Sequence, residues 1–221
     1  MTEKPGEYAR EFASDGVDST GEYFTIGAPL HAVRPGYIRR PADDQLYDAL
    51  FAGRYAHLIA PNRTGKTSLI AATSARLQNN GFRVATLDLA QISERDGGSD
   101  PGRWYYSYAY RLLRQLRLKI DLQSWWQDKS IVSNRQRLVE FYIEVILENI
   151  SEPIVVFIDE IQVLRDKPFA ENLLASIREA QNSRVTEPDF QRLTFALAFS
   201  LILYPLILPN LGAVPVTLGG L

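Results

Sequence analysis

The chain has 221 residues, of which 46% are apolar and 23% charged, a composition typical of a globular protein with room for one sizeable α/β domain. Twenty-four basic residues stand against 26 acidic residues, and the net charge of −2 gives no electrostatic reason to expect nucleic acid or an anionic membrane surface as a partner. Cysteine is absent, which excludes disulfides and thiolate metal sites, and we interpret the two histidines, His31 and His57, as packed or surface side chains.

Residues 1–22 are polar and lack the apolar core of a secretory signal. We therefore expect a disordered N-terminal segment and a cytoplasmic protein.

Residues 41–90 predict a strand–helix–strand unit preceded by a helix. Proline suits a first helical turn and glycine a helix end, so Pro41 and Gly53 bracket the first helix. A short buried strand over 55–60, a helix over 66–79 and a strand over 83–90 follow. Their combined length is that of a βαβ unit.

The second half continues this alternation after a polar loop at 93–102. Apolar residues at helical spacing predict helices over 105–116 and 138–150, and we interpret the tryptophans at 125 and 126, between these helices, as packing residues. The apolar run at 154–160 predicts a central strand buried on both faces. A helix opening at Pro168 and a strand over 192–199 follow, so the fold class expected is a three-layer α/β structure with a mostly parallel sheet flanked by helices.

The stretch APNRTGKT, residues 60–67, has the chemistry of a phosphate-binding loop. A strand gives way to a helix here, and a helix N-terminus with converging backbone N–H groups attracts phosphate. Gly65 lets the backbone approach the phosphates, Lys66 supplies a positive charge to the outer phosphates, and the Thr67 hydroxyl is a candidate Mg²⁺ ligand.

A second element, Asp159-Glu160, ends the apolar strand. A carboxylate at the C-terminal end of a strand next to the phosphate loop can hold Mg²⁺, and a second carboxylate beside it can act as general base. The alternative is that this pair only caps the following helix. The order of the two elements favours a nucleotide site.

Ala60 occupies the position where the usual G-x-x-x-x-G-K-[ST] pattern has glycine. An alanine accepts most turn conformations with φ below zero, and later N–H groups and Lys66 hold the phosphate. We therefore expect a working variant of the loop.

The sequence resembles the bacterial AAA-like ATPase domains that are often fused to WD40 or TPR signalling modules and are similar to STAND and origin-recognition-type ATPases. The likeness covers about residues 23–197 and is carried by YFTIGAPL, GYIRRPADDQLYDALFAGRYAHLIAPNRTGKTSL, RWYYSYAYRLL, SWWQDKS, FIDEIQVL and SIREAQNSRVTEPDFQRLTFAL. It implies a P-loop NTPase fold and ATP as the nucleotide. It also implies that Ala60 is a family trait, since the first loop glycine is commonly absent there.

The resemblance also implies roles for single residues. Lys66 and Glu160 would be catalytic, with Glu160 the hydrolytic residue, and Thr67 and Asp159 would hold Mg²⁺. The nucleotide-binding residues implied are Asn62, Arg63, Thr64, Gly65, Lys66, Thr67 and Ser68, together with Ile38 and Arg39 from a Tyr37–Arg39 segment expected against the adenine. Arg178 and Arg184 match basic positions, where contact with a γ-phosphate competes with a solvated helix-face role.

Beyond residue 198 the resemblance read from the sequence stops, and no charged residue follows Arg192. Three interpretations of the tail at 199–221 stay open. It is a membrane anchor, which Pro205 and Pro209 oppose; a native strand and turn; or a truncated or frame-altered end, which we favour and which would leave the C-terminal part of the domain incomplete.

We therefore divide the chain into a segment at 1–22, an AAA-like P-loop domain at 23–198 and the tail. The function expected is an ATP-binding, nucleotide-dependent switch in a signalling protein, with slow Mg²⁺-dependent hydrolysis. The alternatives are a nucleotide-binding module without turnover, which serves assembly, and a DNA-associated ATPase. Self-association and effector modules outside this chain are the partners considered, and neither a membrane nor nucleic acid is expected.

Overall fold

The computed structural model describes residues 38–61, 63–95, 100–165, 167, 170–199 and 212–218. The expectations for residues 1–22, Tyr37, Asn62 and Pro168 lie outside these residues.

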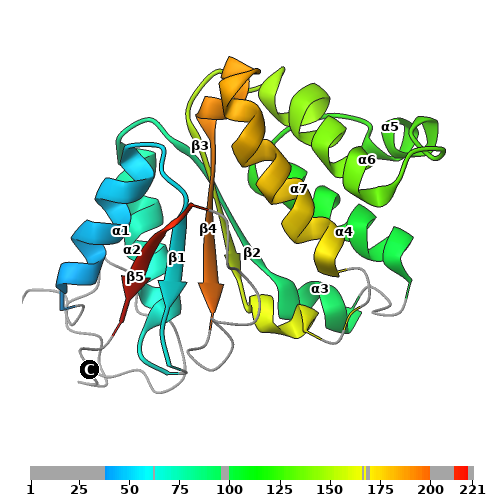
Figure 1. Ribbon diagram of the computed structural model, residues 1–221. Helices are drawn as coiled ribbons and strands as arrows, with labels where there is room; N and C mark the ends of the chain where they lie inside the picture. Colours follow the sequence, from blue (N-terminus) through cyan, green and yellow to red (C-terminus); the bar gives the residue numbers. More distant parts are fainter. Residues whose placement is uncertain are drawn as a thin grey trace, which may run out of the picture.

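A five-stranded sheet forms the centre of the described structure (Figure 1), with strand order β2-β3-β4-β1-β5. All neighbouring strands pair in parallel. The strands are β1 (Ala56–Ile59), β2 (Arg83–Asp88), β3 (Ile154–Asp159), β4 (Leu193–Phe199) and β5 (Val214–Thr217). Since the strands are parallel, their C-terminal ends meet at one edge of the sheet.

Two helices, α1 (Pro41–Phe51) and α2 (Lys66–Asn79), cover one face of the sheet. The Asp43 carboxylate accepts a hydrogen bond from the Arg40 N–H (2.9 Å), which fixes the start of α1. The apolar sides of α1 and α2, with Leu46, Leu69 and Ile70, pack on Val155 and other strand residues in one buried cluster.

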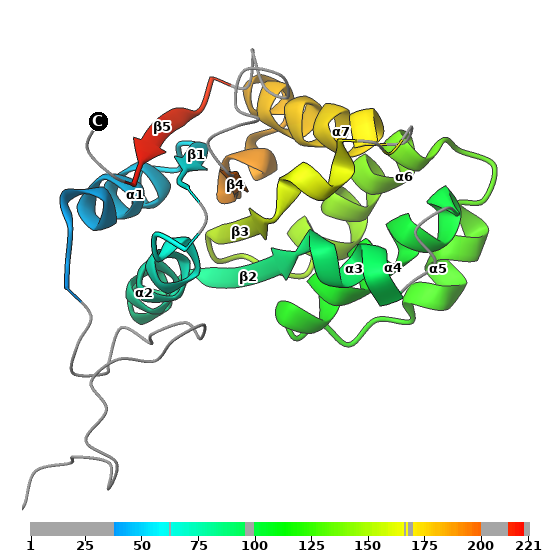
Figure 2. The ribbon, with the colours of Figure 1, turned by 90° about the horizontal axis from the view of Figure 1, so that it is seen from below.

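The opposite face carries the remaining α-helices, as the view turned by 90° shows (Figure 2). They are α3 (Leu89–Arg95), α4 (Pro101–Gln115), α5 (Leu122–Asp128), α6 (Asn134–Glu140) and α7 (Ala170–Asn182). α6 continues into the π-helix η1 (Phe141–Leu147), and short 3-10 turns lie at Ile161–Leu164 (η2), Ser183–Val185 (η3) and Pro188–Arg192 (η4). The three-layer arrangement predicted from the sequence is confirmed.

Aromatic side chains fill the core beneath these helices. Trp104 and Tyr108 stack with ring centroids 6.0 Å apart, and the buried Tyr108 and Tyr142 hydroxyls lie 3.2 Å apart. Trp126 is buried, and the Trp125 indole N–H donates to Glu144 over 2.8 Å. The tryptophan pair is thus part of the packing, as expected.

Some element boundaries differ from the expectation. The strand expected over 83–90 ends at Asp88, because the Asp88 carboxylate accepts a hydrogen bond from the Ala90 N–H (2.9 Å) and so starts α3. The helix expected from residue 138 begins at Asn134, where the Ser133 hydroxyl accepts from the Gln136 N–H (3.2 Å).

Within the tail, β5 pairs with β1 and buries Val216 completely. Residues 200–211 and 219–221 lie outside the described part. None of the helices described is long and apolar enough to cross a membrane.

Candidate nucleotide site

The loop between β1 and α2 lies at the C-terminal edge of the sheet. Gly65 caps α2 with φ of 87°, a left-handed conformation that glycine adopts without a Cβ clash. Arg63 also has a positive φ, 64°, and the Thr64 hydroxyl donates to the Pro61 carbonyl over 2.8 Å. The loop therefore turns sharply just before the first turn of α2, where Lys66, Thr67 and Ser68 begin the helix.

Ala60 extends the β-ladder by one hydrogen bond. Its N–H donates to the Phe199 carbonyl (3.1 Å), and its side chain is buried. Among the described non-glycine residues, positive φ occurs at Arg63, Arg117 and Glu160, so Ala60 keeps an ordinary backbone conformation. The substitution of glycine is thus compatible with the turn, as the sequence argument requires.

Lys66 lies directly against the carboxylates of the second predicted element. Its ammonium forms a buried ion pair with Asp159 and contacts Glu160 Oε1 at 3.0 Å. Burial lowers the pKa of Lys66, but attraction by Asp159 and Glu160 outweighs this effect, so the pKa is raised overall. Residues 93 positions apart in the sequence are therefore brought together at one edge of the sheet.

Glu160 has φ of 57°, a left-handed conformation that is uncommon for a residue with a side chain. Its N–H donates to Asp159 Oδ1 (2.8 Å), and its second carboxylate oxygen accepts from the Gln162 amide. Backbone strain of this kind is concentrated at functional sites. The carboxylate is about one-third exposed and so remains accessible, whereas Asp159 is buried.

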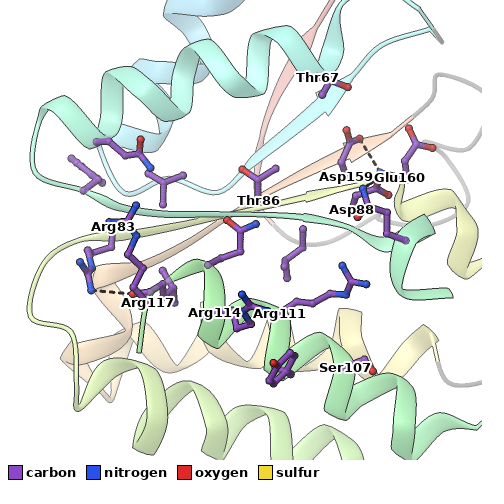
Figure 3. Close-up of a pocket in the computed structure, with 18 residues that line it drawn as sticks. Thr67, Arg83, Thr86, Asp88, Ser107, Arg111, Arg114, Arg117, Asp159 and Glu160 are labelled. Carbon is purple, nitrogen blue, oxygen red and sulfur yellow. Dashed lines mark hydrogen bonds between the residues drawn. The ribbon is translucent and has the colours of Figure 1, made fainter. Parts of the chain in front are cut away.

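Thr67, Asp159 and Glu160 line one end of a cavity of about 1150 Å³ that continues along β2 (Figure 3). The Thr67 hydroxyl and the Asp159 carboxylate are hard oxygen donors, which suit Mg²⁺. No cluster of three or more metal-ligating side chains occurs in the described part of the chain.

Arg40, which the sequence analysis missed, contacts the loop. Its guanidinium donates to the Thr64 carbonyl (2.8 Å) and lies where a Cβ on Gly65 would meet it at 3.4 Å. Arg39 instead pairs with Asp44 near the surface, and Ile38 is 81% exposed. The two consecutive arginines before Pro41 were the sequence signal for a basic residue at the loop. Which of the two contacts the loop depends on how α1 begins, because this start directs Arg40 to the loop and Arg39 to Asp44.

Arg178 and Arg184 do not lie at this loop. Arg184 donates to the carbonyls of Gly53 (2.6 Å) and Phe190 (3.2 Å), and its guanidinium stacks over the Tyr55 ring at 4.6 Å. These partners lie where β1 and β4 begin, at the edge opposite the phosphate loop. Arg178 lines a separate cavity of about 300 Å³ beside Arg135 and Glu179. Within this chain, neither arginine is placed to touch a phosphate at Lys66.

The parallel sheet, the glycine-capped helix and the lysine beside two strand-end carboxylates define the P-loop ATPase class of α/β proteins. The family model described as AAA-like domain matches residues 27–216. The chain therefore belongs to the AAA-like domain family. The match extends to residue 216, past residue 198, where the resemblance read from the sequence ends.

A relative in Synechocystis sp., an uncharacterised WD repeat-containing protein, is 32% identical over 178 residues. The match covers 79% of this chain and 15% of that protein, so the chain corresponds to a small part of the relative.

Two solved structures share the fold. The Aeropyrum pernix ORC2 protein, in ADPNP and ADP complexes, has a TM-score of 0.57 at 16% identity over 89% of this chain and 50% of its own. The Walker-type ATPase of Pyrococcus abyssi has a TM-score of 0.55 at 17% identity over 89% of this chain and 57% of its own.

Proposed function

We propose that this domain binds ATP with Mg²⁺, hydrolyses it slowly and acts as a nucleotide-dependent switch. The observation that carries the proposal is the contact of the Lys66 ammonium with both Asp159 and Glu160. A lysine, a metal-binding carboxylate and a candidate base converge beside a helix N-terminus, as phosphoryl-transfer chemistry requires. The membership of the AAA-like family supports the assignment of ATP.

The ion pair of Lys66 supplies a physical basis for switching. A triphosphate is a stronger anionic partner than the carboxylates, because it adds several charges and the N–H groups of the loop. Nucleotide binding would draw the ammonium toward phosphate and free Asp159 to hold Mg²⁺ together with Thr67. Bound Mg²⁺ supplies charge neutralisation on the phosphate oxygens. The loop and the β3 edge would therefore change partners together when nucleotide binds.

Glu160 has the features of a general base in this scheme. Released from Lys66, its partly exposed carboxylate would orient a water molecule and accept its proton, while Gln162 holds the second carboxylate oxygen. The WD repeats of the Synechocystis relative support the idea that a switch of this type acts on effector modules.

Nucleotide binding by a Lys66→Ala variant tests the proposal. We expect the wild-type protein to bind Mg²⁺-ATP in the micromolar range, about −8 kcal/mol. Loss of the charge-assisted contacts should weaken binding by about tenfold to a hundredfold. Isothermal titration with and without Mg²⁺ measures the effect, and Lys119→Ala, at an exposed lysine, is the matched control. Equal affinity in the wild type and the Lys66 variant, with folding verified by circular dichroism, would refute the role of Lys66.

A Glu160→Gln variant separates a slow ATPase from a module without turnover. The amide keeps the size and hydrogen-bonding capacity of the side chain but cannot take a proton. An ATPase should therefore lose about 10²-fold or more in turnover and keep its ATP affinity. Steady-state phosphate release measures turnover. A wild-type protein that binds ATP and releases no phosphate would establish the binding module instead.

The DNA-associated alternative has less support, since the charge is balanced and the likeness to ORC2 is one of fold alone. Salt-dependent retention on immobilised DNA would favour it over the switch.

A further inference from the structure

The cavity beside β2 is basic along the part that lies away from Lys66. Four arginines line this part, which we call the arginine groove: Arg83, Arg111, Arg114 and Arg117. Figure 3 shows Arg111 and Arg114 on α4 below β2, and Arg83 and Arg117 at the end opposite Thr67 and Glu160. The groove therefore joins a long basic surface to the edge where we place the nucleotide.

Three of the four arginines of the groove are not paired with a carboxylate of the described residues. Among the residues that the structure describes, Arg83, Arg114 and Arg117 form no ion pair. The carboxylates at the other end of the cavity are engaged elsewhere, since Asp159 and Glu160 contact Lys66 and Asp88 accepts from the N–H of Ala90 and the amide of Gln91. An anionic partner would thus pair with Arg114 and Arg117 without breaking an ion pair of these two residues.

The strand that forms the floor of the groove has an open edge. β2 is the last strand of the described sheet on its side and pairs with β3 alone. An edge strand presents unpaired N–H and C=O groups to an extended chain, and arginine clusters recognise acidic motifs. The groove accordingly fits an acidic peptide.

The chain itself contains such a peptide. Residues 1–22 hold two basic residues, Lys4 and Arg10, and six acidic residues at every third or fourth position: Glu3, Glu7, Glu11, Asp15, Asp18 and Glu22. Arg111 and Arg114 lie on α4, and Arg117 follows its C-terminal end. The acidic segment and the groove are therefore complementary in charge.

The part of the chain that follows the segment lies close to the groove. Arg40 contacts the phosphate loop, and Thr67 of the following helix lines the cavity. We propose that residues 1–22 bind in the arginine groove and lie beside the metal-binding edge. This contact does not depend on the nucleotide proposal.

Cross-linking in the full chain tests the contact, because the protein has no cysteine of its own. The double variant Ser14→Cys/Gln115→Cys places one thiol in the segment and one on the lining of the groove. A short bis-maleimide should join this pair faster than Ser14→Cys paired with Val185→Cys, an exposed site outside the groove. Equal rates for the two pairs would overturn the proposal.

Charge variants show whether the arginines cause the proximity. Arg114→Gln/Arg117→Gln should slow cross-linking of the Ser14–Gln115 pair about tenfold, as should Glu7→Gln/Glu11→Gln/Asp15→Asn. Arg103→Gln removes an exposed arginine of α4 outside the groove and should leave the rate unchanged. Raising the salt concentration to 1 M should mimic the arginine variants, since it shortens the screening length to about 3 Å. Arg83 is left unchanged, because it donates to the Leu116 carbonyl (3.0 Å).

Two outcomes would assign the groove differently. If the arginine variants cross-link at the wild-type rate, the arginines only protect an edge strand from pairing, and the proposal fails. If the variants lose affinity for a labelled single-stranded oligonucleotide while cross-linking is unchanged, the groove is a nucleic-acid site, and the proposal fails as well.

Discussion

Lys66 is held in place by a compensation that depends on its neighbours. A buried ammonium is unfavourable alone, and removal of one partner from a buried ion pair typically destabilises a protein by about 3–5 kcal/mol. Asp159 and Glu160 offset this cost, which is why the Lys66 pKa is raised despite burial. The same arrangement keeps the lysine charged and pointed at the site where a phosphate would arrive.

His57 gives a prediction on pH at the scale of one residue. It lies buried on β1 against Phe199, and burial lowers its pKa from 6.5 to about 4. Between pH 6.5 and about pH 4, His57 is protonated in the unfolded chain but stays neutral in the folded protein. Stability from this group is therefore fully present above pH 6.5 and falls toward pH 4, by about 2–3 kcal/mol.

Urea unfolding of the wild type and a His57→Gln variant at pH 7.0, 5.5 and 4.5 measures this effect. The variant lacks the titrating group, so its stability should fall less than that of the wild type over this interval. Carboxylate titration affects both proteins and cancels in the comparison. Parallel pH profiles for the two proteins would contradict the assignment to His57.

At the scale of elements, Arg184 joins segments that meet where β1 and β4 begin. Its guanidinium bonds carbonyl groups of the turn after α1 and of η4, and it stacks over Tyr55. The sequence suggested a phosphate contact or a solvated helix face for this residue. The structure instead makes it a partly buried donor to backbone carbonyls of the turn after α1, of η4 and of Leu193 at the start of β4.

We predict that Arg184→Ala lowers the free energy of unfolding by about 2–4 kcal/mol, because several partly buried carbonyls lose their donor. Arg184→Lys should rescue only part of this loss, since an ammonium cannot reproduce the planar fork. Denaturant unfolding measures both, with Arg54→Ala, at an exposed arginine of the same turn, expected within about 0.5 kcal/mol of the wild type. A similar effect of the two alanine variants would show that Arg184 is not a connector.

Prediction of elements from the sequence was most accurate where a local signal was strong. The helix at 66–79 matches α2, because Gly65 and the residues after Asn79 mark its ends. α3 was missed, since its start depends on the Asp88 carboxylate capping a helix of seven residues. The π-helix after Glu140 was not predicted either, because the apolar spacing of a long helix does not distinguish the two forms.

For the whole molecule, ligand binding should appear as stabilisation. If Mg²⁺-ATP binds the folded state alone, a concentration of a hundred times Kd adds about 2.7 kcal/mol to the unfolding free energy. For a chain of this size the melting temperature should then rise by roughly 5–10 °C. Differential scanning fluorimetry measures the shift.

Two controls make this prediction specific. Lys66→Ala should show little shift at the same ATP concentration, and ATP with EDTA should shift the wild type less than Mg²⁺-ATP does. An equal shift in the wild type and Lys66→Ala would mean that the stabilisation arises elsewhere on the protein.

The amino-acid sequence by itself determined the βαβ unit, the parallel three-layer architecture and the pairing of Gly65-Lys66-Thr67 with Asp159-Glu160. These features depend on local spacing and on strand ends that must share one edge of a parallel sheet. Only the tertiary structure decided that Arg40 rather than Arg39 contacts the loop, that Arg184 is a partly buried donor to three backbone carbonyls and that four arginines line the edge of β2. Such contacts join residues far apart in the chain, and their selection depends on burial and on which backbone groups lack partners, neither of which a one-dimensional pattern contains.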